Sequence, residues 1–152
     1  MRLEDVFRDH QRSVYAYFLR STGRPDVAEE LTQETFFRAC AAALRYRGDA
    51  PVVAWLFGIA RRVLLESSRK GLFDHHAEVP DASAEPDLAQ KLDLEHAFAQ
   101  LAFQDRETLM LVDYLGFTPT EAAELAGIEA GAFRVRLHRA RRNLRDRLKE
   151  TP

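Results

Sequence analysis

The chain has 152 residues, of which 46% are hydrophobic and 30% are charged, and its formal net charge is −2. This length allows one medium domain or two small ones, and the apolar fraction is sufficient for a packed core. The single cysteine, Cys40, excludes an internal disulfide and a cysteine-based zinc site, and no apolar run is long enough to span a membrane.

The composition favours helices over sheets, and its charge is unevenly distributed. Glycine and proline are scarce and β-branched residues are few, so we expect an all-α fold. Residues 72–96 hold seven acidic residues and one lysine, whereas the flanking stretches each carry a small basic excess. The N-terminus is charged and amphipathic and has no signal-peptide pattern, which predicts a soluble, cytoplasmic protein. We therefore expect two small helical domains joined by a flexible acidic linker.

Two helices are predicted at the start of the chain. The first spans about Leu3–Arg20, and Gly23 and Pro25 break the pattern that follows it. The second is expected to begin at Asp26, whose side chain would form a capping box with Glu29.

The second predicted helix carries a large aromatic side chain opposite its apolar stripe. Phe37 shares this outer face with Glu29, Glu30 and Gln33. It is either a partly covered surface aromatic or part of a docking face for a protein partner. Both interpretations stay open at this point.

A loop over residues 45–49 precedes a third predicted helix, for which Asp49 is the expected cap. Trp55, Arg62 and Arg69 are spaced seven residues apart and so fall on one flank of this helix. An aromatic ring among arginines is typical of a single-strand binder, because bases stack on the ring while phosphates meet the charges. Trp55 could equally belong to the core.

The helical pattern stops near residue 71, where prolines, small residues and unpaired acids follow. This composition predicts a flexible linker over residues 72–92. His75 and His76 adjoin each other, but no further ligands stand at metal spacing, so we expect no metal site. Because the chain has no glycine-rich phosphate loop and no nucleophile motif, we expect neither a cofactor nor enzymatic activity.

Residues 93–152 predict a four-helix domain that ends in a helix-turn-helix. Apolar spacing indicates helices around residues 94–101 and over Leu109–Leu115. Two further helices follow, and the last repeats apolar side chains on a narrow stripe. The members of this stripe are Phe133, Leu137, Ala140, Leu144 and Leu148.

The first helix of this pair has start and stop signals. Thr118 is the expected N-cap, and Glu121 completes a capping box around Pro119 at the first helical position. Gly127 can adopt the left-handed conformation that ends the helix.

The last helix is strongly basic. Between Glu129 and Lys149 there are eight arginines and lysines against two acids. An ordinary solvated face is one interpretation, but with almost no acidic partners at i,i+4 this face repels itself unless an anion neutralises it. DNA phosphates are the favoured anion.

Three segments match a known family pattern in order and spacing. They are AEELTQETFFRAC (28–40), WLFGIARRVLLESSRK (55–70) and LAGIEAGAFRVRLHRARRNLRDRL (125–148). Together they resemble a bacterial RNA polymerase sigma factor of the extracytoplasmic-function (ECF) type. The resemblance implies an alternative sigma factor that binds core RNA polymerase, melts the −10 promoter element and reads the −35 element. It also implies a cognate anti-sigma factor that occludes these surfaces until a signal releases it.

The resemblance further implies which residues act. Residues 1–71 would bind core polymerase and the −10 element, and residues 93–152 the −35 element. Core polymerase would be bound by Glu30, Gln33, Glu34, Phe37 and Arg38. The −10 element would be bound by Tyr46, Arg47, Gly48, Asp49, Trp55, Arg61, Arg62 and Arg69. The −35 element would be bound by Thr118, Arg134, Arg136, His138, Arg139 and Arg141.

Several residues depart from the family pattern. Cys40 stands where tryptophan is usual, Arg62 replaces asparagine, and Glu66 replaces aspartate. Ala132, Phe133 and Val135 replace a more typical Thr-Val and Ser in the last helix. Because two small hydroxyls are lost there, we expect a −35 preference away from the family average.

Two other functions compete with this assignment. A stand-alone helix-turn-helix regulator would need dimer symmetry and an apolar pocket for its signal. A sigma-like domain that no longer binds polymerase would act only as a protein-interaction module.

Overall fold

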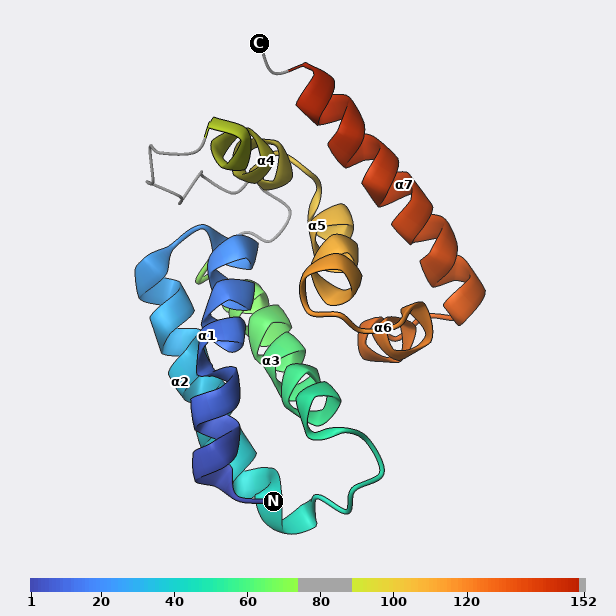
Figure 1. Cartoon of the computed structure of the whole chain (residues 1–152). Helices are drawn as coiled ribbons and strands as arrows, with labels where there is room; N and C mark the ends of the chain where they lie inside the picture. The colour runs from blue at the N-terminus through green and yellow to red at the C-terminus, as the bar shows by residue number, and fades with distance from the viewer. Residues whose placement is uncertain (74–88, 151–152) are drawn as a thin grey trace. The chain divides into compact units, whose positions relative to one another are not determined.

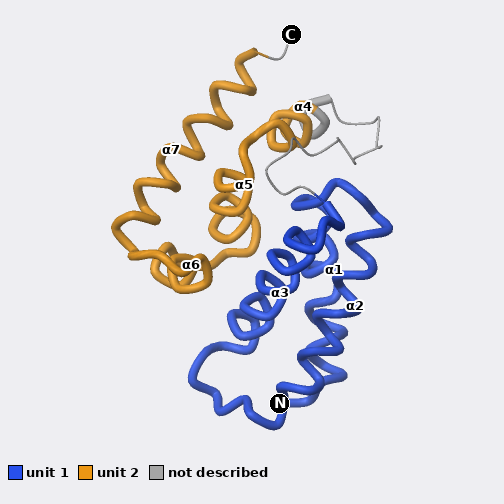
Figure 2. The backbone as a smooth tube through the Cα atoms, turned by 180° about the vertical axis from the view of Figure 1, so that it is seen from behind, with its two compact units in different colours: residues 1–74 blue, residues 75–152 orange. Residues whose placement is uncertain are grey.

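The computed structural model describes residues 1–73 and 89–150, with side chains described from residue 93 in the second stretch. The described residues are mostly helical and include no strand. The chain divides into two compact units, Met1–Asp74 and His75–Pro152 (Figure 2). The all-α prediction is confirmed.

The first unit is built from three helices, α1 (Leu3–Thr22), α2 (Pro25–Ala42) and α3 (Val52–Arg69), with a short 3₁₀ turn η1 (Ala43–Arg45) after α2. Helix α2 packs against both α1 and α3 (Figure 1). Large apolar side chains from all three helices are buried, and burial of this apolar surface is the main force holding the unit together. They include Val14, Tyr17, Phe18, Leu31, Leu56, Phe57, Val63 and Leu64.

Two of the expected helix caps in this unit are wrong. Helix α2 begins at Pro25 with Arg24 as N-cap, so Asp26 lies inside the first turn and no side-chain cap forms. Pro25 explains the shift, because its fixed φ and missing N–H suit the first helical position. Helix α3 likewise begins after Pro51, and Asp49 does not cap it.

The second unit contains α4 (Ala89–Ala99), α5 (Phe103–Leu109), a π-helical turn η2 (Met110–Tyr114), α6 (Pro119–Ala126) and α7 (Ala130–Lys149). Helix α7 packs against the other three α-helices (Figure 1). The expected segment Leu109–Leu115 is therefore only the end of a helical stretch that starts at Phe103. Three polar residues at the start of that stretch hid it: Asp105, Arg106 and Glu107 are all buried.

Helix α4 begins at Ala89, so its first four residues lie within the stretch 72–92 that was expected to be linker. Residues 74–88 lie outside the described part of the chain. The flexible linker predicted for 72–92, and His75 and His76 within it, therefore fall largely outside the residues that the structure describes.

The helix-turn-helix forms as its sequence signals predict. The Thr118 hydroxyl accepts a hydrogen bond from the Glu121 amide at 3.1 Å, and the Glu121 carboxylate accepts one from the Thr118 amide at 2.9 Å. Gly127 ends α6 in the left-handed region, with φ of 73°. On α7, Phe133, Leu137 and Ala140 are buried. The last two members of the predicted stripe, Leu144 and Leu148, are half-buried.

Candidate functional site

The outer face of α2 presents an aromatic side chain to solvent. Phe37 is 71% exposed, and Glu30 and Gln33 on the same face are exposed as well. Beside this face lies a hollow of about 500 Å³, lined by residues of α2 and α3 that include Phe37 and Glu66. An exposed phenylalanine at the rim of a hollow is an anchor geometry for a protein partner.

Arg38 is held on this face by two carboxylates. Its guanidinium donates to Glu34 at 2.9 Å, one turn away on α2, and to Glu66 of α3 at 2.7 Å. The hydrogen bond from Arg38 lowers the pKa of the Glu66 carboxyl, and the hydrogen bonds to Glu66 and Glu34 raise the pKa of Arg38. The triad fixes the α2–α3 crossing next to Phe37. Sequence reasoning missed Glu66 as a member, because nothing in a single sequence links residues 38 and 66.

The loop between η1 and α3 folds back on its own helix through an aromatic pair. The rings of Tyr46 and Trp55 lie 5.1 Å apart and are tilted by 49°. The Tyr46 hydroxyl donates a hydrogen bond to the carbonyl of Ala50, which closes the loop. Gly48 has φ of 79°, in the left-handed region that favours glycine. Trp55 is half-buried, so it is partly core and partly available surface.

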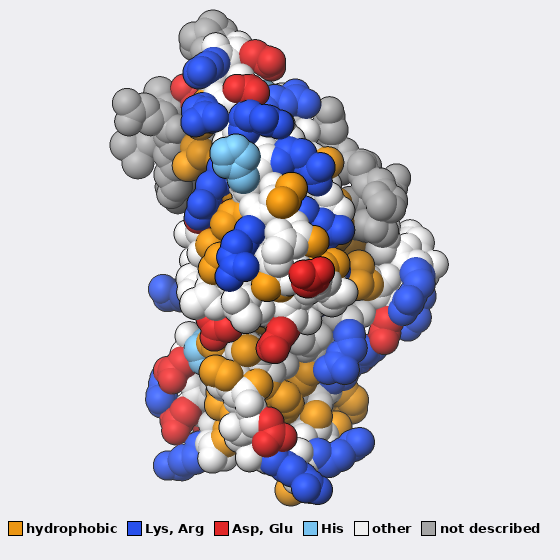
Figure 3. All heavy atoms as spheres, turned by 90° about the vertical axis from the view of Figure 1, so that its right-hand side faces the viewer, with side chains coloured by type: hydrophobic (Ala, Val, Ile, Leu, Met, Phe, Trp, Pro, Cys, Tyr) orange, Lys and Arg blue, Asp and Glu red, His pale blue; other side chains and the backbone are white. Residues whose placement is uncertain are grey.

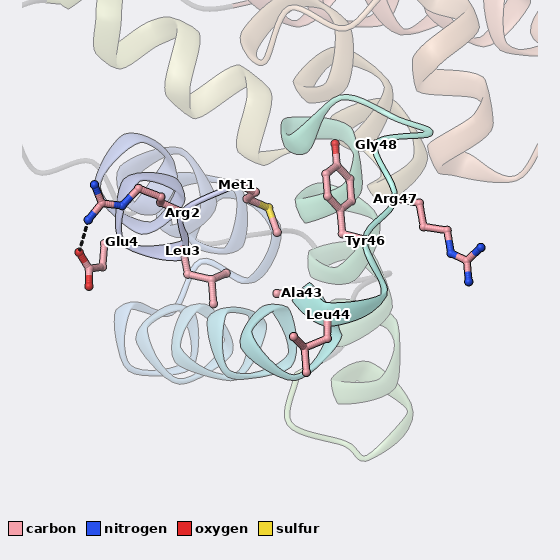
Figure 4. A pocket seen from close by; sticks show the side chains of 9 residues that line it. All are labelled: Met1, Arg2, Leu3, Glu4, Ala43, Leu44, Tyr46, Arg47 and Gly48. Atoms are coloured by element: carbon pink, nitrogen blue, oxygen red, sulfur yellow. Dashed lines mark ion pairs between the residues drawn. The ribbon is translucent and has the colours of Figure 1, made fainter.

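A second hollow, of about 630 Å³, lies between this loop and the first turn of α1. Figure 4 shows apolar groups around it, whereas the charged ends of Arg2 and Arg47 point away on opposite sides. Leu44 at its edge is 97% exposed. Its lining residues are Met1, Arg2, Leu3, Glu4, Ala43, Leu44, Tyr46, Arg47 and Gly48. The sequence pointed to the last three, but not to Leu44 or to α1.

The arginines expected to follow a single strand lie on α3 after Trp55. Arg62 and Arg69 are exposed, and Arg61 is half-buried. Asp49 in the preceding loop is exposed. The structure thus brings Tyr46, Trp55 and the hollow together, and leaves two cations free to meet phosphates farther along the helix.

Helix α7 exposes a basic face opposite its buried stripe. Arg134, His138, Arg139 and Arg141 are exposed, and Arg136 is half-buried. Lys and Arg side chains gather along this helix in the space-filling view (Figure 3). Since α6, Gly127 and α7 form a helix-turn-helix, the first turns of α7 have the geometry of a recognition helix.

Several α7 cations are tied to other helices of their own unit. Arg141 binds both carboxylate oxygens of Asp113, at 2.6 and 3.1 Å, and this hydrogen bonding raises the pKa of Arg141. Arg139 donates to the side chain of Gln104 at 3.0 Å. These contacts orient α7 on η2 and α5. They were not foreseen, because Asp113 precedes Arg141 by 28 residues and Gln104 precedes Arg139 by 35 residues.

The chain matches two family models, Sigma-70 region 2 over residues 6–71 and Sigma-70 region 4 over residues 91–144. It is also 31% identical to the ECF RNA polymerase sigma factor SigL of Mycobacterium tuberculosis, over 95% of this chain and 88% of that protein. The chain belongs to the ECF RNA polymerase sigma factors. As an ECF sigma factor it is an alternative sigma factor that directs transcription initiation, and the stand-alone regulator is not favoured.

Other relatives agree with this assignment of the ECF sigma factor. EcfG of Rhodopseudomonas palustris is 31% identical over 95% of this chain and 86% of that protein. Among solved structures, the sigma factor RpoE of Bartonella quintana, in complex with the anti-sigma factor NepR, matches with a TM-score of 0.82 and 25% identity, covering 98% of each chain.

Two further features are absent from the residues that the structure describes. None of the described helices of this ECF sigma factor is long and apolar enough to cross a membrane. Within the same part of the chain, no three His, Cys, Asp or Glu side chains are grouped so that they could hold a metal ion.

Proposed function

We propose that this ECF sigma factor acts in the cytoplasm, where its first unit binds core polymerase and opens the −10 element while its second unit reads the −35 element. The observation that carries the proposal is the contrast between two helix faces. The outer face of α2 is aromatic and acidic, which suits a protein, whereas that of α7 is basic, which suits DNA.

Core polymerase would dock on α2. Phe37 would enter a pocket of the polymerase, with Gln33 and Glu30 as polar neighbours, since phenylalanine and other aromatic residues are enriched at the cores of protein interfaces. Arg38 and Glu34 would act chiefly by orienting this face of α2, because Arg38 is already paired with both Glu34 and Glu66.

The −10 element would be held by the loop at Tyr46. An unstacked base would enter the hollow of Figure 4, whose apolar walls favour a flat ring over water. The ring of Trp55 packs against that of Tyr46, and Arg62 and Arg69 would contact phosphates of the separated strand. Unstacking a base costs roughly a few kcal/mol, which such a pocket and phosphate contacts can offset without any bond being made or broken.

The −35 element would be read by the first turns of α7. Arg134, Arg136 and His138 would contact phosphates and base edges, with Arg139 and Thr118 at the margins. Arg141 would contribute mainly through its bond to Asp113, which fixes the angle of the helix.

An anti-sigma factor is the partner that would keep these surfaces covered. The relative RpoE was solved with such a protein, and this chain has the same fold over nearly its whole length. We expect no cofactor and no catalytic activity, since sigma factors are generally not enzymes.

The test is run-off transcription with core polymerase of the same organism on a library of promoters. We expect initiation at one discrete promoter class, lost in a Gln33→Ala, Phe37→Ala double variant. A Gln11→Ala variant, which truncates an exposed amide on α1, serves as the matched control and should transcribe normally. If the double variant initiates as well as the native chain, α2 is not the docking face, and if no core complex forms at all, the proposal is wrong.

A further inference from the structure

One large apolar side chain stands out on the basic helix. Val135 of α7 is 65% exposed, although α7 buries its other large apolar groups at least in part. It lies on the face opposite Phe133 and Leu137, in the second turn of the helix. A valine held in water gains nothing for the fold, and its place on the outer face of the second helix of the helix-turn-helix makes it a candidate for contact with DNA.

The surroundings of Val135 form a shallow apolar strip. One turn before it on the same face are Gly131 and Ala132, which are both exposed and both small. A small-residue neighbourhood lets another surface approach the helix closely, and it leaves the valine as the most prominent group of the strip.

Two cations next to the strip make hydrogen bonds to other parts of the second unit. Arg134 reaches back to the Thr120 hydroxyl at 3.5 Å, and Arg139 to Gln104 at 3.0 Å. These hydrogen bonds hold two guanidinium groups beside the strip, so Val135 stands among positively charged side chains. This arrangement fits the floor of the DNA major groove, with phosphates on either side.

We propose that Val135, together with the Ala132 methyl group, recognises the 5-methyl group of a thymine in the −35 element. The inference rests on the proposed function, because it assumes that α7 enters the −35 major groove. The thymine methyl is the one apolar group that bases display in that groove, and apolar side chains recognise it by contact. The usual family pattern has small hydroxyl side chains at positions 132 and 135, which could form hydrogen bonds to DNA. With Ala132 and Val135 in their place, recognition would depend on apolar contact with a methyl group.

A protein partner is the other surface that could cover a valine. The charges argue for DNA, since every charged side chain within one turn of Val135 on α7 is an arginine. An acidic protein surface would satisfy the arginines but would give no methyl-dependent readout, so the experiment separates the two.

The test uses holoenzyme and the promoter selected above. Each thymine of the −35 element, on both strands, is replaced in turn by deoxyuridine, which removes only the methyl group. At one position we expect the thymine-to-deoxyuridine change to lower the affinity of the native holoenzyme for the promoter about fourfold, the value for one buried methyl group. Val135→Ala and Val135→Ser should bind the thymine promoter more weakly and should no longer distinguish thymine from uracil there.

A Leu94→Ala variant, which truncates an exposed leucine of α4, is the matched control and should keep the full thymine-to-uracil ratio. Circular dichroism checks that the variants fold. The inference is overturned if no deoxyuridine substitution matters, which is the result expected for a valine covered by protein. It is also overturned if the sensitivity persists in Val135→Ala, because the methyl group is then read by another residue. Either outcome leaves the proposed function intact as long as the holoenzyme initiates, whereas failure to initiate at any promoter overturns both.

Discussion

Helices α2 and α7 are held in their units in the same way but expose different surfaces. Each buries one stripe against its own unit and presents the opposite face to solvent, and each has an arginine held by a carboxylate from elsewhere in its unit. Arg38 is bound by Glu66 of α3, and Arg141 by Asp113 of η2. In both cases the paired arginine helps to orient the helix, and its charge is compensated by the carboxylate.

The two helices differ in the side chains that surround the exposed apolar residue. Phe37 stands among acids and an amide, and Val135 among arginines. Both groups are exposed to a similar degree, so exposure alone does not tell a protein contact from a DNA contact. The charges around the group decide which partner is favourable.

The largest effect that tests this comparison comes from two phenylalanines. Phe133 is 1% exposed and Phe37 is 71% exposed. We expect Phe133→Ala to lower the free energy of unfolding by about 3–5 kcal/mol, because it removes a buried ring and leaves a cavity. Phe37→Ala should change it by no more than about 0.5 kcal/mol while binding to core polymerase is lost. Urea unfolding followed by circular dichroism measures the first quantity, and a comparable loss in both variants would contradict the assignment of the two faces.

A smaller effect separates two arginines of α7. Arg134→Ala should reduce the slope of log K against log salt for promoter binding by holoenzyme by about 1, because one phosphate contact is lost. Arg141→Ala should change that slope less, since Asp113 already balances the guanidinium charge. Titrations of promoter DNA at several salt concentrations give both slopes, with Asp113→Asn, Arg141→Ala as the control without the ion pair. A larger change for Arg141→Ala would make it a direct phosphate contact.

The smallest effect concerns the acid stability of the first unit. The pKa of Glu66 is lowered from its ordinary value of 4.5, chiefly by the hydrogen bond from Arg38. The charged carboxylate therefore stabilises the folded state above about pH 4.5, and this contribution is lost as the pH falls through the lower folded-state pKa. Glu66→Gln should be less stable than the native chain by at most about 1 kcal/mol near neutral pH, because the pair is partly exposed. The difference should shrink as the pH falls below 4.5, the ordinary pKa of this carboxyl.

Urea unfolding of both proteins at several pH values measures this difference. Glu4→Gln removes a carboxylate that is far more exposed and lies 3.7 Å from Arg2, so it serves as the control. A stability difference between Glu66→Gln and the native chain that stays constant on acidification would show that Glu66 acts by packing and not by charge.

Local signals in the sequence predicted much of this fold because their causes are local. The capping box of Thr118, the left-handed Gly127 and the apolar stripe of α7 involve residues at most a few turns apart, and each is present. The failures also have local causes. Asp26 and Asp49 were expected to cap helices, but α2 begins at Pro25 and α3 begins directly after Pro51.

The parts that could not be predicted depend on contacts distant in the chain. The start of α5 was missed because Asp105, Arg106 and Glu107 are buried despite their charges, against the usual preference of such residues for water. The partners of Arg38 and Arg141, and the wall that α1 gives to the hollow at Tyr46, come from elements far from them in sequence. A single sequence does not show which residues far apart in the chain come into contact.

The arrangement of α7 has a consequence for how promoter preference can evolve. Gly131, Ala132 and Val135 fill no core space, whereas the stripe that packs the helix runs through Phe133, Leu137 and Ala140. Substitutions of the first set should leave the stability of the unit nearly unchanged. If α7 reads the −35 element as proposed, natural drift or deliberate redesign can alter the recognised DNA without a compensating mutation. A bacterium that duplicates such a gene therefore has a short path to two regulators that do not cross-talk.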